Sequence, residues 1–404
     1  MYENNLAFAT YKDQEDPLKN YRKEFLIPTN NEGIELVYLC GNSLGLQPKK
    51  TSNYLQQELN DWAKFGVEGH TDAKNPWLPY HEFLTNSMAK IVGAKPSEIV
   101  IMNSLTTNLH LMMVSFYQPT KSKYKIVIES DAFPSDKYAM ESQLKFHGYD
   151  SNDGLILWKP REGENLCRFE DLEKIMEDQG DEIALLMIGS TNYYSGQLYP
   201  LKKITELGHK HNSLVGFDLA HGVGNIQPNL HETGVDFAVW CTYKYLNSGP
   251  GSLGGCFVHE RHANNTDLNR FAGWWGHNKQ TRFNMRHEFD AIPGAEGWQL
   301  SNAPVLGMAA HLAGAVAAHS TRPVIGIPIE SGGMGGMDSL LSTAMMPPGV
   351  PVATVAVGKA GAKNSAILAV QILATSDAEL SQKLHDYKNN MREEVLKKDK
   401  ALNS

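Results

Sequence analysis

An aspartate and a lysine that lie 26 positions apart each close an apolar stretch of the chain. Asp218 ends the run Gly216-Phe217, and Lys244 closes the stretch that begins at Phe237. Burial favours the neutral form of a lysine amine, and a neutral amine can form a Schiff base with an aldehyde cofactor. A carboxylate at the other end of such a site would keep a pyridine nitrogen protonated, which is what pyridoxal phosphate chemistry requires. These two residues alone also fit a structural ion pair.

Two further segments carry side chains suited to such a cofactor. Residues 103–110 place hydroxyls and amides just before an apolar helical stretch, where a helix N-terminus can receive a phosphate. Taken alone, this cluster is equally a helix cap. Phe133 follows an apolar run at 125–128, so its ring could stack on an aromatic cofactor or belong to the core.

Glycines and indoles beyond the lysine suggest a backbone that passes close to a ligand. The run 249–255 contains four glycines but lacks the spacing of a dinucleotide fingerprint, which must follow a strand and open a helix. It predicts either a close approach to a ligand or a plain tight turn. Trp274 and Trp275 stand between glycines, where their N–H groups suit a phosphate or a substrate. Buried core tryptophans are the alternative.

The elements that would position these side chains alternate between helical and strand-like patterns over residues 1–302. Leu55, Leu59, Trp62 and Phe65 recur at helical spacing and predict a helix. Short apolar runs predict buried strands at 125–128, 183–188, 214–217, 237–240 and 256–258. Alternation of this kind favours a mostly parallel sheet with crossover helices, and polar residues follow the strands where ligands of α/β folds gather.

Composition excludes several classes of function. The chain has 404 residues and a net charge of −8, so we expect no nucleic-acid partner and no anionic membrane partner. No apolar run approaches the roughly 18 residues that a transmembrane helix needs. The four cysteines lie far apart without a Cys-x-x-Cys pair, which argues against a disulfide framework and a structural zinc site. We therefore expect a cytoplasmic protein with a small-molecule substrate and no metal.

A change in composition near residue 303 divides the chain. Of the 37 aromatic residues, 36 lie within residues 1–302, and only five charged residues occur between 303 and 376. The second segment also has an α/β pattern, with predicted strands at 323–328 and 350–357 and helices at 311–319 and 364–374. A terminal amphipathic helix is predicted from Leu380 to Val395. We expect two domains, residues 1–304 and 305–404.

From about Tyr11 to Pro304 the chain resembles kynureninase, a fold-type-I pyridoxal phosphate hydrolase of tryptophan catabolism that also serves NAD biosynthesis. The motifs that carry this resemblance occur in order along the chain. They are Leu39-Cys40-Gly41-Asn42-Ser43-Leu44-Gly45-Leu46-Gln47-Pro48, Phe133-Pro134-Ser135-Asp136, Asn192-Tyr193-Tyr194-Ser195-Gly196-Gln197, Phe217-Asp218-Leu219-Ala220-His221, Tyr243-Lys244-Tyr245-Leu246-Asn247 and Gly273-Trp274-Trp275-Gly276-His277.

The resemblance implies a homodimer that hydrolyses kynurenine or 3-hydroxykynurenine to an anthranilate and alanine. Lys244 would bind the cofactor aldehyde, Asp218 would pair with the ring nitrogen, and Tyr243 would assist addition of water to the substrate ketone. The cofactor-binding residues it implies are Leu105, Thr106, Phe133, Pro134, Ser135, Asp136, Asp218, His221, Tyr243, Lys244, Trp274 and Asn302. Residues that would shape the substrate pocket are His70, Ser301 and Asn302.

From about residue 309 to 390 the chain resembles the C-terminal part of phosphoribosylaminoimidazole carboxylase of the mutase class. The motifs that support this resemblance are Ala309-Ala310-His311-Leu312-Ala313-Gly314, Pro323-Val324-Ile325-Gly326-Ile327-Pro328, Gly336-Met337-Asp338-Ser339-Leu340-Leu341-Ser342, Pro347-Pro348-Gly349-Val350-Pro351-Val352-Ala353-Thr354-Val355 and Asn364-Ser365-Ala366-Ile367-Leu368-Ala369. This likeness implies a partial flavodoxin-like three-layer α/β segment attached to the large domain.

Neither resemblance is complete. Kynureninases continue into a small domain whose arginine holds the substrate carboxylate, whereas only Arg322 and Arg392 lie beyond residue 303, neither in a matching context. The carboxylase-like segment keeps His311 but lacks that family's Gly-Ser-x-Ser-Asp and Ser-Ala-His-Arg motifs. Two alternatives to kynurenine hydrolysis therefore stay open. One is a carboxyaminoimidazole ribonucleotide mutase, and the other is a hybrid chain that binds pyridoxal phosphate without turnover.

Overall fold

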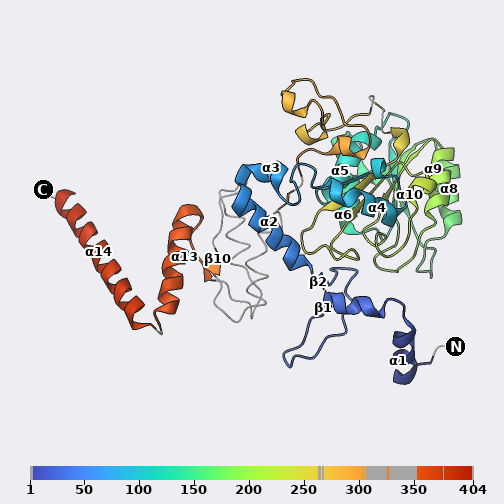
Figure 1. Ribbon diagram of the computed structural model, residues 1–404. Coiled ribbons are helices and arrows are strands. Elements are labelled where there is room, and N and C mark those ends of the chain that lie inside the picture. Colours follow the sequence, from blue (N-terminus) through green and yellow to red (C-terminus); the bar gives the residue numbers. More distant parts are fainter. Residues whose placement is uncertain are drawn as a thin grey trace. The chain divides into compact units, whose positions relative to one another are not determined.

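The structure of the protein is a computed structural model that describes residues 3–262, 265, 268–302, 304–305, 325–326, 353–375 and 377–402. The chain forms two compact units, Met1–Val305 and Leu306–Ser404, coloured from blue to red along the sequence in Figure 1. His311, the helix predicted at 311–319 and, in the strands predicted at 323–328 and 350–357, residues 323–324, 327–328 and 350–352 lie outside the described residues.

A seven-stranded sheet forms the centre of the first unit. Its strand order is β3 (Ile99–Met102), β9 (Gly254–Val258), β8 (Phe237–Cys241), β7 (Leu214–Asp218), β6 (Ile183–Gly189), β4 (Lys125–Glu129) and β5 (Leu155–Trp158). All neighbouring pairs are parallel except the two made by β9, which is antiparallel to both β3 and β8. The mostly parallel sheet is confirmed, and all five strands predicted from apolar runs are present.

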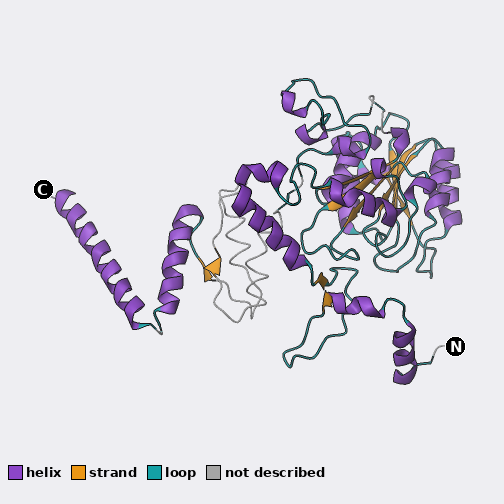
Figure 2. Cartoon of the chain, viewed as in Figure 1, coloured by secondary structure: helices purple, strands orange, loops and turns teal. Residues whose placement is uncertain are grey.

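Helices flank this sheet, as Figure 2 shows. The helices of the first unit are α1 (Leu6–Glu15), α2 (Thr51–Phe65), α3 (Gly69–Asp72), α4 (Glu82–Val92), α5 (Leu105–Phe116), α6 (Pro134–Phe146), α7 (Ser151–Gly154), α8 (Phe169–Gln179), α9 (Leu201–Lys210) and α10 (Leu230–Thr233), of which α1 to α3 lie away from the sheet. Short 3-10 helices lie at Lys19–Glu24, Gly66–Glu68, Pro96–Glu98, Glu260–His262, Trp274–Gly276, Arg282–Asn284 and Ala295–Trp298. A two-residue pair, β1 (Phe25–Leu26) and β2 (Gln47–Pro48), precedes α2.

The predicted helix α2 is present, but its apolar stripe does not face the core. Trp62 is 55% exposed, and the buried residues of α2 are Glu58 and Asp61. The Glu58 carboxylate accepts hydrogen bonds from the Trp77 indole at 3.0 Å and the Tyr80 hydroxyl at 3.2 Å. The loop after α3 therefore supplies donors that make burial of this carboxylate favourable, which helical spacing alone did not show.

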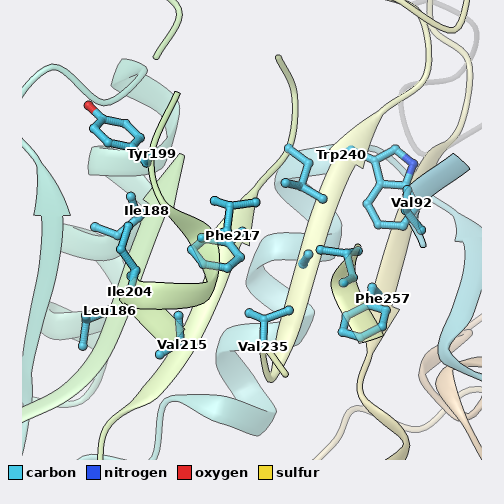
Figure 3. Packing of buried hydrophobic residues seen from close by; sticks show 14 of the residues in the cluster. Val92, Leu186, Ile188, Tyr199, Ile204, Val215, Phe217, Val235, Trp240 and Phe257 are labelled. Carbon is cyan, nitrogen blue, oxygen red and sulfur yellow. The ribbon is translucent and has the colours of Figure 1, made fainter. Parts of the chain in front are cut away.

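The core lies on both faces of the sheet. Alternate residues of the central strands point to opposite faces, so Ile188 and Phe217 join one cluster, whereas Met187 and Val239 join the other. Figure 3 shows the first cluster, in which side chains of neighbouring strands pack against those of the covering helices. Each fully buried large apolar side chain stabilises the fold by about 1.5–3 kcal/mol, so this sheet is a rigid support for its strand ends.

The described part of the second unit also has α/β character. β10 (Ile325–Gly326) pairs in parallel with β11 (Ala353–Thr354), and α13 (Gly358–Leu373) and α14 (Ala378–Leu402) follow. The helix predicted at 364–374 and the terminal helix predicted from Leu380 are both present. None of the described helices combines the length and apolar character needed to cross a bilayer.

Candidate active site

A cavity of about 370 Å³ lies at the carboxyl ends of β4, β6 and β7. This volume falls within the range of sites for small molecules. Nine of the residues predicted for the site line it, namely Leu105, Thr106, Phe133, Ser135, Asp136, Asp218, His221, Tyr243 and Lys244. The remaining lining residues were not predicted and are Asn42, Ser43, Glu129, Gly189, Thr191, Asn192, Tyr193 and Ala220.

Lys244 lies three residues beyond the end of β8, in a loop rather than on the strand itself. Its Nζ is 2.9 Å from Nε2 of His221, which also faces the cavity. Burial and the nearby positive charge of Lys244 lower the pKa of His221 to about 4. The imidazole is therefore neutral at physiological pH, and its Nε2 can accept a hydrogen bond from the amine.

The loop that follows β8 and carries Lys244, here called the lysine loop, is held in place by a segment about 200 residues away in the sequence. Gly45 donates its backbone N–H to the Tyr243 carbonyl at 2.8 Å, and Asn247 Nδ2 donates to the Leu46 carbonyl at 2.9 Å. A Cβ atom at Gly45 would clash with the Lys244 carbonyl oxygen and lie 2.6 Å from Asn247 Nδ2. Only glycine allows this approach, so the motif at 39–48 positions the lysine.

Three buried carboxyl groups lie on the floor of the cavity. Burial raises the pKa of Asp136 well above its usual range, and the adjacent charge of Asp218, to which it hydrogen-bonds, raises it further. Burial also raises the pKa of Asp218, but the hydrogen bond from Asp136, the Ala220 N–H at 2.6 Å and the charge of Lys244 oppose this. Asp136 therefore holds the proton and donates it in a hydrogen bond to the ionised Asp218.

Glu129, the third of these carboxyl groups, ends β4. Burial raises its pKa to about 7, although the Gly189 N–H donates to both of its carboxylate oxygens at 3.2 Å. A Cβ at Gly189 would lie 2.7 Å from Glu129 Oε1, so the glycine at the end of β6 makes room for the acid. The prediction of a strand ending at Ile128 left Glu129 out. No feature of the sequence distinguishes it from a solvated acid after a strand.

Two helix N-termini open onto the cavity. α5 begins at Leu105 and α6 at Pro134, and the Thr106 and Ser135 hydroxyls lie 3.1 Å apart between them. The first backbone N–H groups of a helix have no partners within the helix and favour an anion. Ser104 makes no side-chain cap to α5, so the described structure leaves the first donors of α5 available.

The glycine run 249–255 approaches protein rather than the cavity. Gly249 and Gly251 adopt φ of 93° and 69°, which only glycine adopts readily. A Cβ at Gly254 would lie 2.7 Å from the Trp240 carbonyl oxygen and 3.2 Å from the Leu105 nitrogen. The run therefore combines a tight turn with a close approach that seats the start of α5.

Phe133 lies at the cavity and is 53% exposed as a residue, so it does not belong to the core. Its ring meets Tyr193 edge to face, with centroids 5.4 Å apart. Exposed aromatic side chains at a cavity can stack on a planar ligand. Tyr243 lines the same cavity, and burial raises the pKa of its phenol to about 12, with Cys241 contributing. The phenol is therefore protonated at neutral pH.

Five predicted residues do not line the cavity of this single chain. His70 packs against Trp77 with ring centroids 5.4 Å apart. Trp274 lines a separate pocket, and its indole N–H donates to the Arg282 carbonyl at 3.1 Å. Ser301 and Asn302 are exposed near the end of the first unit. Pro134 begins α6 beside the cavity without lining it.

The cavity residues fit pyridoxal phosphate. Lys244 supplies an amine, the ionised Asp218 suits a protonated ring nitrogen, and the two helix N-termini suit a phosphate. Thr191 adds an independent observation, because its buried hydroxyl lines the cavity and has no hydrogen-bond partner among the described residues. A polar ligand would satisfy such a group.

Comparison with known proteins identifies two families along the chain. The family model for class-V aminotransferases matches residues 37–273, and the model for AIR carboxylase matches residues 303–394. Kynureninase from Myxococcus xanthus is 56% identical over 77% of this chain and 73% of its own length. Kynureninase from Mus musculus is 47% identical over 73% of this chain and 66% of its own length.

Solved structures support the fold. A cysteine desulfurase from Thermococcus onnurineus matches with a TM-score of 0.56 at 17% identity, over 72% of this chain and 67% of that one. A cysteine desulfurase from Escherichia coli matches with the same TM-score at 15% identity, over 75% and 77%. These likenesses confirm the fold-type-I architecture expected from the sequence. Together with the identity to curated relatives, they show that the chain belongs to the kynureninase family, with an AIR carboxylase segment at its C-terminus.

Proposed function

We propose that the protein is a pyridoxal phosphate-dependent hydrolase that cleaves L-kynurenine or 3-hydroxykynurenine to anthranilate or 3-hydroxyanthranilate and L-alanine. The observation that carries this proposal is the position of Lys244 beside neutral His221, in one cavity with the buried Asp136–Asp218 pair. The kynureninase relatives support the substrate class. Their names give kynureninase without separating the two substrates.

Each part of the cofactor has a matching group in the cavity. Lys244 would hold the aldehyde carbon, Asp218 the ring nitrogen and Phe133 the ring face. Thr106 and Ser135, with the N-termini of α5 and α6, would hold the phosphate. When bound, the cofactor supplies an electron sink for the bonds broken at the substrate Cα and Cβ.

The proton transfers fall to the chain's own side chains. The Lys244 amine lies beside His221 and can move a proton at Nζ to and from the substrate. Neutral His221 can accept a hydrogen bond from that amine and so help to orient it, because burial keeps the imidazole uncharged. Tyr243, which stays protonated at neutral pH, can donate a hydrogen bond to the substrate ketone while water adds to it.

We further propose a cytoplasmic homodimer. Large apolar side chains are exposed in the segment before α2, including Leu36 at 45%, Val37 at 88% and Leu39 at 84%. A contiguous exposed apolar segment marks an interaction surface. A second copy would also bring the predicted residues that lie outside the cavity, such as His70 and Trp274, to the site of its partner.

The AIR carboxylase match favours a second candidate function. A carboxyaminoimidazole ribonucleotide mutase would depend on residues 303–394, and nucleotide conversion should then be lost in His311→Asn. The third possibility is a chain that holds the cofactor without turnover, because the arginine expected for the substrate carboxylate is missing. Losing one partner of a buried charge pair costs about 2–5 kcal/mol, or about 30- to 4,000-fold in binding.

The deciding experiment is borohydride reduction of the cofactor-loaded protein, followed by peptide mass mapping and an assay of anthranilate release. We expect a pyridoxyl adduct on Lys244, absent from Lys244→Ala and retained in Lys174→Ala, a lysine exposed on α8. Product release that Lys244→Ala abolishes supports the hydrolase. An adduct without product supports the cofactor-binding hybrid, and soluble protein without any adduct excludes both.

A further inference from the structure

A buried carboxylate and two histidines meet at the edge of the sheet opposite the cofactor cavity. Glu98 immediately precedes β3, His259 immediately follows β9, and His231 lies in α10. Because β9 is antiparallel to β3 and β8, its last residues lie beside the first residues of both neighbours. The cavity lies at the other edge, where β4, β6 and β7 end. This cluster therefore has no part in the cofactor site.

The geometry of the three side chains suits a metal ion. Oε1 of Glu98 lies 3.0 Å from Nδ1 of His231 and 3.9 Å from Nδ1 of His259. The two imidazole rings stack with centroids 5.2 Å apart and planes inclined by 14°, and the three ligand atoms all lie within 4.8 Å of one another. Tetrahedral zinc with bonds of about 2.0 Å separates its ligands by about 3.3 Å, which the two distances bracket.

The charge of Glu98 also calls for a cation. Its side chain is 0% exposed, and its ion-pair partners among the described residues are the two histidines, which are charged only if protonated. Backbone N–H groups of Lys95 and Glu260 donate to the carboxylate at 2.9 Å each, but they supply dipoles and no net charge. A fully buried carboxylate is costly unless a positive charge compensates it.

A second cluster with metal-ligand residues lacks this deficit. His81, Glu82 and Glu296 also bring three ligand atoms within 4.8 Å. There, however, Nζ of Lys279 lies 2.9 Å from Glu82 and 2.7 Å from Glu296, so an ammonium group already neutralises the acids. The comparison favours the Glu98 cluster as the place where a bound cation would neutralise a buried acid.

We propose that Glu98, His231 and His259 bind one divalent transition-metal ion of the Zn²⁺, Co²⁺ and Ni²⁺ class, with water as a fourth ligand. Two imidazole nitrogens and one carboxylate oxygen are a ligand set that these ions prefer. On binding, the His231 proton that faces Glu98 moves to Nε2, which frees Nδ1 for the metal. His259 exchanges its 3.2 Å hydrogen bond from the Arg261 N–H for a metal bond.

Such an ion would join three segments that are distant in sequence, and this effect can be measured apart from catalysis. The probe is Zn²⁺ added to the metal-stripped, cofactor-loaded full chain, followed by titration calorimetry and thermal unfolding. We expect one equivalent of Zn²⁺ to bind and the unfolding midpoint to rise, because the ion binds only the folded state. His231→Gln and His259→Gln should each raise the Kd more than about tenfold, since even outer-shell partners cost that much.

Matched variants separate this site from others. His385→Gln changes an exposed histidine of α14 and should keep wild-type binding. His81→Gln removes a ligand of the second cluster and should keep it as well. Failure of the wild type to bind Zn²⁺, or binding that survives in both His231→Gln and His259→Gln, overturns the proposal.

A wild-type measurement decides the matter even if those two variants do not fold. Co²⁺ in a four-coordinate site of nitrogen and oxygen ligands gives a strong visible absorption that six-coordinate aqueous Co²⁺ lacks. One equivalent of that absorption, displaced by Zn²⁺, is the expected result for this site. Its absence from the folded wild type contradicts the proposal directly.

Discussion

Buried carboxyl groups occur at both edges of the seven-stranded sheet, yet their surroundings differ. At the cavity edge Glu129, Asp136 and Asp218 lie near one another, and Lys244 is the only lysine or arginine among the described residues that line the cavity. At the opposite edge Asp236, just before β8, accepts hydrogen bonds from three side chains and one backbone amide. These are the His209 and His262 rings, each at 2.9 Å, the Arg261 guanidinium and the Val215 N–H at 2.7 Å.

The pKa shifts follow the partners rather than the degree of burial. Burial alone would raise the pKa of Asp236, but hydrogen bonds from His209 and His262, with the Arg261 charge, hold it well below its usual range. Burial with few cations raises the pKa of Glu129 and Asp136 instead. The Asp236 network is thus neutralised and structural, whereas the cavity edge keeps an excess of acid that a cationic ring nitrogen can use.

The largest effect on stability is expected in the neutralised Asp236 network. Asp236→Ala would leave Arg261 and two histidines without their shared acceptor, and breaking a buried charge network costs about 3–5 kcal/mol. Urea unfolding should show this loss, with kcat of the folded fraction unchanged. Asp178→Ala, which removes an exposed acid of α8 paired with Lys174, should cost no more than about 1 kcal/mol. Equal losses in the two variants would contradict the comparison.

The cavity edge should respond in the opposite way. In Asp218→Asn the amide cannot carry the charge that pairs with the ring nitrogen, so kcat/KM for kynurenine should fall about 30- to 4,000-fold. The free energy of unfolding of the cofactor-free protein should stay level or rise, because burial disfavours the charge that is removed. Steady-state kinetics and urea unfolding of the same preparation test both parts. A stability loss as large as that of Asp236→Ala, without a loss of activity, contradicts them.

The architecture of the first unit could be predicted largely from hydrophobic pattern. The five predicted strands are present because each is a continuous apolar run, as buried parallel strands require. β3 and β5 were not predicted, although each is an apolar run of four residues like the runs that were. The antiparallel direction of β9 could not be predicted either, because an apolar run carries no information about direction.

The site was predictable where its residues follow strands, and not where they depend on distant partners. Asp218 and Lys244 follow apolar runs, and the structure places both at the cavity. Asn42 and Ser43 reach it only through the contact between Gly45 and the lysine loop, which no local pattern encodes. His231 and His259 resemble ordinary surface histidines in the sequence. Only the antiparallel course of β9 brings His259 beside Glu98.

The pH dependence of the free energy of unfolding tests whether Glu129, at the cavity edge, has the raised pKa that distinguishes it from Asp236. Its pKa rises from 4.5 to about 7 on folding, so the folded state binds the proton more tightly. The resulting stability is full below pH 4.5, declines as pH rises through this window, and is absent above pH 7, a change of about 3 kcal/mol. Glu129→Gln removes that dependence. Its unfolding free energy relative to wild type should therefore grow between pH 5 and pH 7.5, in urea titrations of the cofactor-free proteins. A difference that is constant with pH contradicts this assignment.

The smallest predicted effect concerns the single cation at the cavity edge, which the comparison requires to be fixed in place. In Gly45→Ala the new methyl group would clash with the Lys244 carbonyl oxygen and press on Asn247, so the lysine loop must shift. Overpacking of this kind costs about 1–3 kcal/mol. If about 1.4 kcal/mol of it falls on cofactor binding, the Kd for pyridoxal phosphate rises about tenfold, which absorbance titration would show. Gly41→Ala is the matched control, because a Cβ at Gly41 meets nothing within 4 Å. Equal cofactor affinity in the two variants would mean that Gly45 does not hold Lys244 in place.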